Sequence, residues 1–260
     1  MSDSDRYARQ IAFGPIGSAG QKRLASSSVV FAGCGALGSV SASQLVRAGV
    51  GRVRLVDRDV IELSNLQRQV LYDEDDCRQK LPKAEAARRK LARVNSQVVI
   101  EAAVCDITPD NALGLLEGFD LIIDAVDNAE CRYLLNDVAV KTGTPWIYAA
   151  VAGARGQTLT VIPGTTPCLR CLFPTPPEPG TVPTAQTDGV IAPVVNVVAS
   201  AQVAEALKLL TGRVDALRAG LLTVDLWAGT FRTTFTGART PRVDCPCCGR
   251  RRFEFLEGTP

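Results

Sequence analysis

Histidine does not occur anywhere in the 260 residues of this chain. No imidazole can therefore act as a general base, as the partner of a nucleophile or as a metal ligand. Any metal site must use sulfur or oxygen ligands, and any catalysis must proceed without an imidazole.

The chain also lacks an excess of charge of one sign. It has 29 lysines and arginines against 27 acidic residues, a net charge of +2, and this balance gives no reason to expect nucleic acid as a partner. The first ten residues, MSDSDRYARQ, are polar and charged and do not form a secretory signal. We therefore expect a cytoplasmic protein.

A long uninterrupted apolar run is missing as well. The most apolar segment, residues 190–210, is broken by a proline and by polar residues such as Gln202 and Glu205. We expect a buried amphipathic helix there and no membrane span, and the sequence leaves open whether it lies in the core or in a dimer interface. With 46% hydrophobic residues, the chain can bury the core of one large domain, residues 1–260.

Cysteine, in contrast, is frequent, with nine residues. In a long chain without a secretory signal, free thiols or metal ligands are a better expectation than disulfides. Two Cys-x-x-Cys pairs, Cys168 with Cys171 and Cys245 with Cys248, predict a structural zinc site made of four thiolates. The alternative is a redox pair or unrelated buried thiols. Cys247 is surplus, and the sequence does not decide whether it replaces Cys245 or Cys248.

Apolar, strand-like runs alternate with helical segments in the first part of the chain. The runs are SSVVFAG, RVRLVD, VVIEAAV, DLIIDAV and WIYAAVAG, and the helical segments include residues 37–47 and the segment that begins at Pro82. This alternation predicts an α/β fold with a Rossmann-like, doubly wound, mainly parallel sheet. After Gly153, runs such as GQTLTVIPG and LLTVDL predict a smaller, partly antiparallel sheet region, and the proline-rich residues 173–189 predict a long loop.

A glycine-rich motif follows the first strand-like run. Gly33-Cys-Gly35-Ala36-Leu-Gly38 reads GxGxxG between a strand and a helix, an arrangement that presents backbone N–H groups to phosphate oxygens. Asp57 ends the next strand, where a carboxylate can reach ribose hydroxyls. The alternative is a turn that only packs the helix on the sheet, and the motif by itself fits NAD as well as ATP.

Residues beyond this motif favour ATP. Polar and charged residues come after strands or at a helix start, namely Ser64, Asn65, Arg68, Lys83, Asp127 and Asn128. Ligands of open α/β sheets bind at the carboxyl ends of the strands, and cations with a metal-binding carboxylate suit phosphoryl chemistry better than a nicotinamide ring. The alternative reading of Asp127 is a helix cap.

With RYARQ, GCGALG, LVDRD, SNLQRQ, LPK and AVDN in this order, the chain resembles the ThiF/MoeB/HesA family of ubiquitin-activating-enzyme-like adenylyltransferases, from about Tyr7 to Gly249. The resemblance implies a nucleotidyltransferase that uses ATP and Mg²⁺. Such an enzyme activates the C-terminal Gly-Gly carboxylate of a ubiquitin-like sulfur-carrier protein (MoaD- or ThiS-like) as an acyl-adenylate and releases pyrophosphate. It also implies a homodimer, with residues 1–153 binding nucleotide and residues 154–260 serving acceptor binding, dimerisation and zinc binding.

The family's functional residues fall on matching positions of this sequence. The resemblance implies that Asp57 binds ribose and that Arg68 and Lys83 bind phosphate. It further implies that Asp127 binds magnesium and that Arg9 reaches into the neighbouring subunit's ATP site. The expected catalytic residues are Arg9, Arg68, Lys83 and Asp127; the expected nucleotide contacts are Gly33, Gly35, Ala36, Gly38, Asp57, Ser64, Asn65, Arg68, Lys83, Asp127 and Asn128; the family's zinc ligands fall on Cys168, Cys171, Cys245 and Cys248.

Two departures from the family pattern matter. Ala36 stands where the family often has glycine, but alanine keeps its N–H donor, so we expect little loss if its φ is negative. Some relatives form a covalent link through a cysteine of the long loop; Ala185 stands at that place, and no cysteine occurs between Cys171 and Cys245. We therefore expect the reaction to end at the acyl-adenylate, with a separate sulfur donor and no fused sulfurtransferase domain.

The expected chemistry agrees with the lack of histidine. A C-terminal carboxylate has a reference pKa of about 3.5 and is ionised at neutral pH, so it can attack ATP without a general base. Three alternatives stay open: an NAD-dependent oxidoreductase, a non-catalytic ATP-binding subunit, and an adenylating enzyme for a peptide or natural-product precursor. The sequence does not tell which carrier protein or pathway is served.

Overall fold

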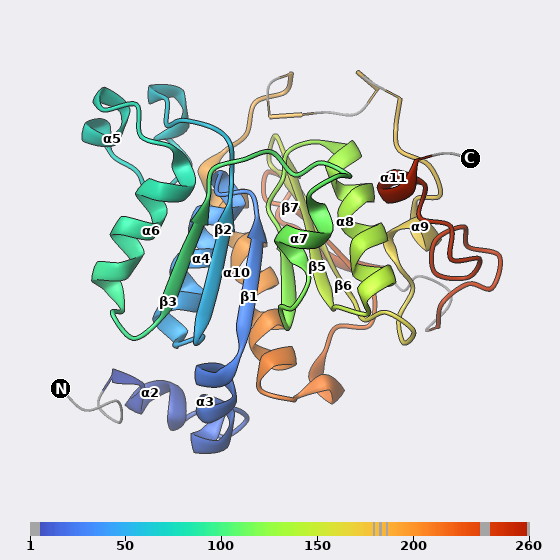
Figure 1. Cartoon of the computed structure of the whole chain (residues 1–260), viewed down its shortest axis with the longest axis horizontal. Helices are drawn as coiled ribbons and strands as arrows, with labels where there is room; N and C mark the ends of the chain where they lie inside the picture. Colours follow the sequence, from blue (N-terminus) through green and yellow to red (C-terminus); the bar gives the residue numbers. More distant parts are fainter. Residues whose placement is uncertain (1–5, 179, 182–183, 186, 235–239, 259–260) are drawn as a thin grey trace.

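One mixed sheet of eight strands forms the centre of the molecule. A computed structural model describes residues 6–178, 180–181, 184–185, 187–234 and 240–258, and its strand order is β3-β2-β1-β4-β5-β6-β7-β8 (Figure 1). The strands are β1 (Ser28–Ala32), β2 (Arg52–Val56), β3 (Val99–Ala103), β4 (Leu121–Asp124), β5 (Trp146–Ala152), β6 (Arg155–Val161), β7 (Leu221–Asp225) and β8 (Thr230–Thr234). The predicted α/β class is confirmed.

The pairing changes direction at β5. Strands β1 to β5 pair in parallel, whereas β5 to β8 pair antiparallel. The predicted antiparallel region therefore exists, but it continues the parallel sheet and is not a smaller sheet of its own. The reason is the tight turn after Ala152, which lets β6 pair along the whole length of β5, from Trp146 opposite Val161 to Ala152 opposite Arg155.

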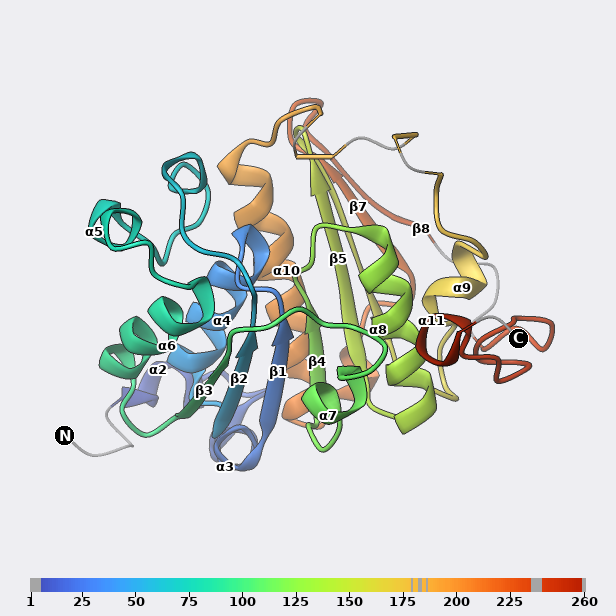
Figure 2. The same cartoon turned by 45° about the horizontal axis from the view of Figure 1, so that its top comes forward.

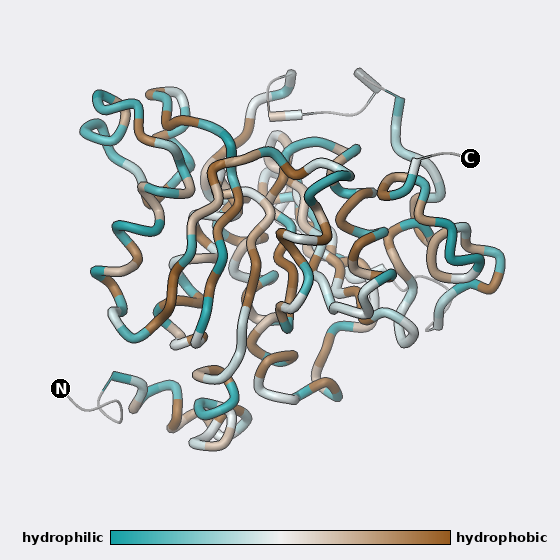
Figure 3. The backbone as a smooth tube through the Cα atoms, in the orientation of Figure 1, coloured by the Kyte–Doolittle hydropathy of each residue, from teal (hydrophilic) through white to brown (hydrophobic). Residues whose placement is uncertain are grey.

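Helices cover both faces of the sheet, as Figures 1 and 2 show. Successive side chains of a strand point to opposite faces: Val29 and Phe31 pack against α4 (Ala36–Ala48), α6 (Lys83–Val94) and α10 (Ala192–Leu210), whereas Val30 packs against α7 (Ala112–Leu116) and α8 (Ala129–Thr142). Burial on both faces explains the nearly continuous apolar strands. In Figure 3 these strands are largely brown, and many of the outer turns are teal.

Shorter helices lie around this core. They are α2 (Ala8–Ile11), α3 (Gly17–Ser26), η1 (Leu63–Asn65), α5 (Glu74–Arg78), α9 (Leu169–Leu172), η2 (Val214–Ala216) and α11 (Glu254–Glu257). The helix predicted at 37–47 is confirmed by α4, and Pro82 is the N-cap of α6. The described part of the predicted loop at 173–189 has no helix or strand; residues 179, 182, 183 and 186 of that loop lie outside the described residues.

By length and hydropathy, α10 is long and apolar enough to cross a membrane. In the fold it packs against the sheet and α4, and its polar residues Gln202 and Glu205 are fully buried. The Gln202 amide donates to the backbone oxygens of Asp124 (2.8 Å) and Ile147 (2.7 Å), where β4 and β5 diverge. The prediction of a buried helix is confirmed, and the apolar composition of α10 reflects this packing.

The strand order reverses beside β1, which has β2 on one side and β4 on the other. The loops that follow these three strands all leave the same edge of the sheet (Figure 2). In open α/β sheets this reversal point is the usual place for a ligand. The structure thus brings the segments after Ala32, Val56 and Asp124 to one place.

Candidate active site

The glycine loop after β1 packs tightly against the segment after β4. Gly33 has a positive φ of 99°, and a Cβ there would lie 2.5 Å from the Ala125 backbone oxygen; a Cβ on Gly38 would lie 2.2 Å from the Gly33 oxygen. These two glycines are therefore required for packing. Gly35 is different: it is the N-cap of α4, and the nearest atom to a Cβ there is Gln69 Nε2 at 3.7 Å.

The loop leaves the start of α4 available to an anion. The first N–H groups of any α-helix have no partner within the helix, and they carry the positive end of its dipole. No side chain caps α4 at Gly35. Ala36 is the first helical residue and does not have a positive φ, so its methyl group causes no strain and its N–H remains, as expected.

Asp57 lies beside the glycine loop, as its spacing predicts. Its Oδ2 accepts the Cys34 N–H at 2.7 Å, and its Oδ1 accepts the Asp59 N–H at 2.8 Å. Burial raises the pKa of Asp57 above its usual value, while the Cys34 N–H and the charge of Lys83 oppose that rise. Each carboxylate oxygen keeps a lone pair beyond these bonds, so the group can still accept hydrogen bonds from a ligand.

Lys83 reaches the same place from the first turn of α6. Its ammonium is buried and bonds Asp59 Oδ2 at 2.8 Å. The buried Tyr72 hydroxyl lies within bonding distance of the backbone oxygens of Cys34 (2.7 Å) and Lys83 (3.2 Å), and so ties the glycine loop to α6. Sequence reasoning missed Asp59 and Tyr72; the second aspartate of LVDRD was the signal for Asp59.

The SNLQRQ segment forms a turn beside the loop. Asn65 is buried and accepts the Glu62 N–H at 3.2 Å, while Arg68 donates to the backbone oxygen of the exposed Ser64 at 2.8 Å. Asn65 thus shapes the turn, and Arg68 lies half-buried on it. Gln69, which sequence reasoning also missed, is buried near Gly35, and its Oε1 has no hydrogen-bond partner among the described residues.

Asp127 and Asn128 are exposed and follow β4. Asp127 comes two residues after Ala125, whose carbonyl contacts Gly33, so it lies near the glycine loop. The N-cap of α8 is Asn128, whose Oδ1 accepts the Cys131 N–H at 2.8 Å. The alternative reading of Asp127 as the helix cap is therefore wrong.

Arg9 is not brought to this site within its own chain. It is exposed on α2, next to Tyr7, which packs against Gly49 at the C-terminal end of α4. The glycine loop lies at the other end of α4, a helix of 13 residues and therefore about 20 Å long. Arg9 and the glycine loop therefore lie near opposite ends of α4.

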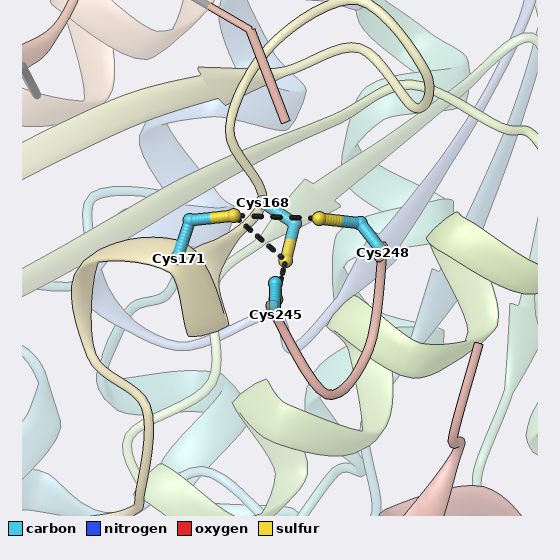
Figure 4. A group of neighbouring side chains, drawn as sticks. All are labelled: Cys168, Cys171, Cys245 and Cys248. Atoms are coloured by element: carbon cyan, nitrogen blue, oxygen red, sulfur yellow. Dashed lines mark hydrogen bonds between the residues drawn. The ribbon is translucent and has the colours of Figure 1, made fainter. Parts of the chain in front are cut away.

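The two Cys-x-x-Cys pairs meet in one cluster (Figure 4). The four sulfur atoms lie within 4.8 Å of one another, with 3.9 Å between Cys168 and Cys171, 3.6 Å between Cys168 and Cys245, and 3.3 Å between Cys171 and Cys248. This group could hold a metal ion. Cys247 does not belong to it: its buried sulfur accepts a hydrogen bond from Asn136 of α8 at 3.2 Å.

The comparisons with known proteins identify the family. Residues 7–247 match the model of the ThiF family. The chain belongs to this family. It is 47% identical over 251 residues to the sulfur carrier protein ThiS adenylyltransferase of Bacillus subtilis, covering 96% of this chain and 73% of that protein. It is 44% identical over 250 residues to the sulfur carrier protein adenylyltransferase of Thermus thermophilus, covering 94% and 90%.

A solved structure shares the fold. Escherichia coli MccB with ATP has a TM-score of 0.81 at 23% identity, covering 95% of this chain and 75% of MccB. The resemblance stated from RYARQ, GCGALG and the later motifs is thus confirmed, over nearly the range that those motifs indicated.

Proposed function

We propose that this ThiF family protein is an ATP-dependent adenylyltransferase that activates the C-terminal Gly-Gly carboxylate of a ubiquitin-like sulfur-carrier protein. The observation that carries the proposal is the similarity of at least 94% of this chain to two sulfur carrier protein adenylyltransferases. The meeting of the glycine loop, Asp57 and Lys83 at the reversal point of the sheet supports it.

The reaction needs alignment and positive charge more than proton transfer. The acceptor carboxylate is ionised at neutral pH, attacks the α-phosphorus of ATP, and the bond to pyrophosphate breaks. The N–H groups at the start of α4 and the side chains of Lys83 and Arg68 supply positive charge for the phosphates. Asp57 accepts hydrogen bonds from the ribose hydroxyls. A chain without histidine can perform each of these tasks.

The Lys83–Asp59 ion pair fits a site that binds and releases a charged ligand. A buried ammonium without a partner would be costly, and the half-exposed Asp59 provides that partner at 2.8 Å. Phosphate oxygens can replace or share this partner.

Magnesium fits the oxygen ligand that Asp127 offers. An exposed carboxylate beside a phosphate site is a typical protein ligand for Mg²⁺, which keeps several waters and takes its other ligands from the phosphates. The ion supplies charge neutralisation for the phosphate oxygens when it is bound. Asp127 would hold it. The Oδ1 of Asn128 caps α8, and its amide N–H groups would be the part of that side chain that contacts the phosphates.

Zinc fits the cysteine cluster. Zinc–sulfur bonds of about 2.3 Å in a tetrahedron place sulfur atoms about 3.8 Å apart. Three of the sulfur–sulfur separations in the cluster are 3.3 to 3.9 Å, and all lie within 4.8 Å. Four thiolates would leave no open ligand position, so the role of Cys168, Cys171, Cys245 and Cys248 is structural.

The composite site requires a second copy of the chain. Arg9 lies far from the glycine loop of its own chain, and a homodimer in which Arg9 enters the neighbouring ATP site accounts for that position.

The sulfur atom comes from a separate donor, because Ala185 stands where some relatives have a cysteine. We keep the expectation of a cytoplasmic protein.

The test is ATP–pyrophosphate exchange with purified protein, Mg²⁺ and a panel of carrier proteins that end in Gly-Gly. We expect exchange with one carrier and its loss when the terminal glycine is removed. Exchange with a peptide precursor, but with no carrier, would change the acceptor class. Tight ATP binding without exchange for any acceptor would indicate a non-catalytic subunit, and binding of NAD in place of ATP would contradict the proposal altogether.

A further inference from the structure

A buried ion pair contacts the backbone of Val126, the residue before Asp127. Asp124, the last residue of β4, is fully buried, and its Oδ2 lies 3.3 Å from Nε of Arg132 in the first turn of α8. The Arg132 guanidinium also lies over the Tyr148 ring of β5, with 5.6 Å to the ring centroid. None of the family motifs considered for the nucleotide site includes Asp124 or Arg132.

Asp124 and Arg132 each form a hydrogen bond with the backbone of Val126. Asp124 Oδ1 accepts the N–H of Val126 at 3.1 Å, and Arg132 Nη2 donates to the backbone oxygen of Val126 at 2.7 Å. On the far side of Asp127, Asn128 is fixed as the N-cap of α8. The exposed Asp127 therefore lies between two residues, Val126 and Asn128, that are held by hydrogen bonds.

Burying the Asp124–Arg132 ion pair costs desolvation free energy that packing alone would not require. Asp124 Oδ2 and Arg132 Nε are ion-pair partners at 3.3 Å but lack the geometry of a strong hydrogen bond, and desolvating two charges often costs more than their attraction returns. Burial raises the pKa of Asp124 to about 6, and the charge of Arg132 opposes the rise. An arrangement of this cost indicates a task beyond stability.

We propose that Asp124 and Arg132 are positioning residues that fix the direction in which Asp127 presents its carboxylate to the metal and phosphates. Both side chains are largely withdrawn from solvent: the Asp124 side chain has no exposed area, and 16% of the Arg132 side chain is exposed. They act through the Val126 peptide groups. The inference rests on the proposed function in one respect, the assignment of Asp127 to magnesium.

Two variants test the two side chains of this pair one at a time. Arg132→Lys keeps the positive charge, but one ammonium cannot reproduce the planar fork that faces Asp124 and donates to Val126. Asp124→Asn keeps an oxygen for the Val126 N–H and removes the negative charge. Arg52→Lys is the control, because Arg52 also pairs with a carboxylate (Glu101, 2.6 Å) and lies over an aromatic ring (Phe119), but in a more exposed place at the opposite end of β2.

The experiment measures Mn²⁺ binding by electron paramagnetic resonance in the presence of a non-hydrolysable ATP analogue. Partners of a metal ligand typically change metal affinity 10- to 100-fold, so we expect about a tenfold weaker Mn²⁺ affinity in Arg132→Lys. The metal-free affinity for the analogue should stay within about twofold. Hydrogen exchange of the Val126 amide should become faster, and Arg52→Lys should match the wild type in all three.

Equal losses of metal-bound and metal-free nucleotide affinity would overturn the proposal, because they would indicate a general structural role. Unchanged Mn²⁺ affinity despite faster amide exchange would overturn it as well. If Arg132→Lys does not fold, Asp124→Asn decides by the same criteria. Failure of the proposed function is distinguishable: the wild type would then bind Mn²⁺ with the analogue but exchange pyrophosphate with no carrier.

Discussion

The two clusters of functional side chains are built in opposite ways. At the edge of the sheet that carries the candidate active site, the backbone of the glycine loop is fixed by close packing, while Asp127, Asn128 and Ser64 are exposed. In the cysteine cluster, the sulfur atoms turn toward one another, and three of the four residues are buried. The first arrangement leaves ligand positions open, and the second closes them.

This difference separates turnover from stability. A site that binds ATP and releases pyrophosphate in each cycle needs groups whose partners can be exchanged, such as the Lys83–Asp59 pair. A site that joins distant parts of the chain needs groups that never exchange. Substitutions in the two clusters should therefore change different measurements, and the following variants test that separation.

Cys168→Ser should have the largest effect, on stability. Removing one thiolate from a four-sulfur site should release the bound metal and lower the free energy of unfolding by about 3 to 5 kcal/mol. The protein that remains folded should exchange pyrophosphate at a normal rate per molecule. Zinc content and urea denaturation measure the effect, with Cys105→Ser, outside the cluster, as the control. Retention of the metal would contradict the assignment.

Asp127→Ala should lower activity without lowering stability, in contrast to Cys168→Ser. Loss of an electrostatic group at a phosphoryl site typically slows a reaction 10²- to 10³-fold, so we expect that loss in pyrophosphate exchange. The melting temperature should stay unchanged because the side chain is exposed. Asp215→Ala, an exposed aspartate on η2, is the matched control. Wild-type exchange in Asp127→Ala would remove Asp127 from the catalytic residues.

The buried Asp124 predicts a pH effect of intermediate size. Its pKa is raised from 3.8 to about 6, so between these values the folded protein binds more protons than the unfolded chain and becomes less stable as the pH rises. The titration of Asp124 alone should lower the free energy of unfolding by up to about 3 kcal/mol between pH 4 and pH 7. The free energy of unfolding of Asp124→Asn, measured by urea denaturation at both pH values, should fall by correspondingly less between pH 4 and pH 7. An identical decline in both proteins would contradict the assignment.

Cys247→Ala should have the smallest effect. The residue is buried beside the cluster but bonds Asn136, so its loss should leave the metal content unchanged and cost about 1 kcal/mol of stability. Metal analysis and denaturation of the same sample measure both quantities. Loss of the metal in this variant would mean that Cys247 is a ligand.

Much of the architecture could be predicted from the sequence because it depends on local patterns. The apolar runs gave the parallel strands, and the glycine motif placed the start of α4. The pairing of β6 with β5 could not be predicted, because alternation along residues 155–161 does not tell which strand lies alongside. That information is in the short turn after Ala152 and in the packing of α10 beneath both strands.

The candidate site likewise has residues that could be predicted from the sequence and contacts that could not. The motif positions of Asp57 and Lys83 were predictable, but their partners were not. Asp59 pairs with Lys83 across 24 positions, and Cys247 is excluded from the cluster by Asn136, which lies 111 positions away. The Asp124–Arg132 pair was hidden for another reason: at the end of an apolar strand, the sequence does not show which way the Asp124 carboxylate points.

The cysteine cluster also constrains how the protein can be made. Cys168 and Cys245 are 77 positions apart, so at synthesis rates of about 5 to 20 residues per second the first pair waits about 4 to 15 s for the second. During that interval Cys168 and Cys171 are two open thiols on an incomplete chain, able to take up a wrong metal or to be oxidised. If the proposed zinc site is correct, the supply of metal and reductant at the ribosome should therefore influence the yield of folded protein.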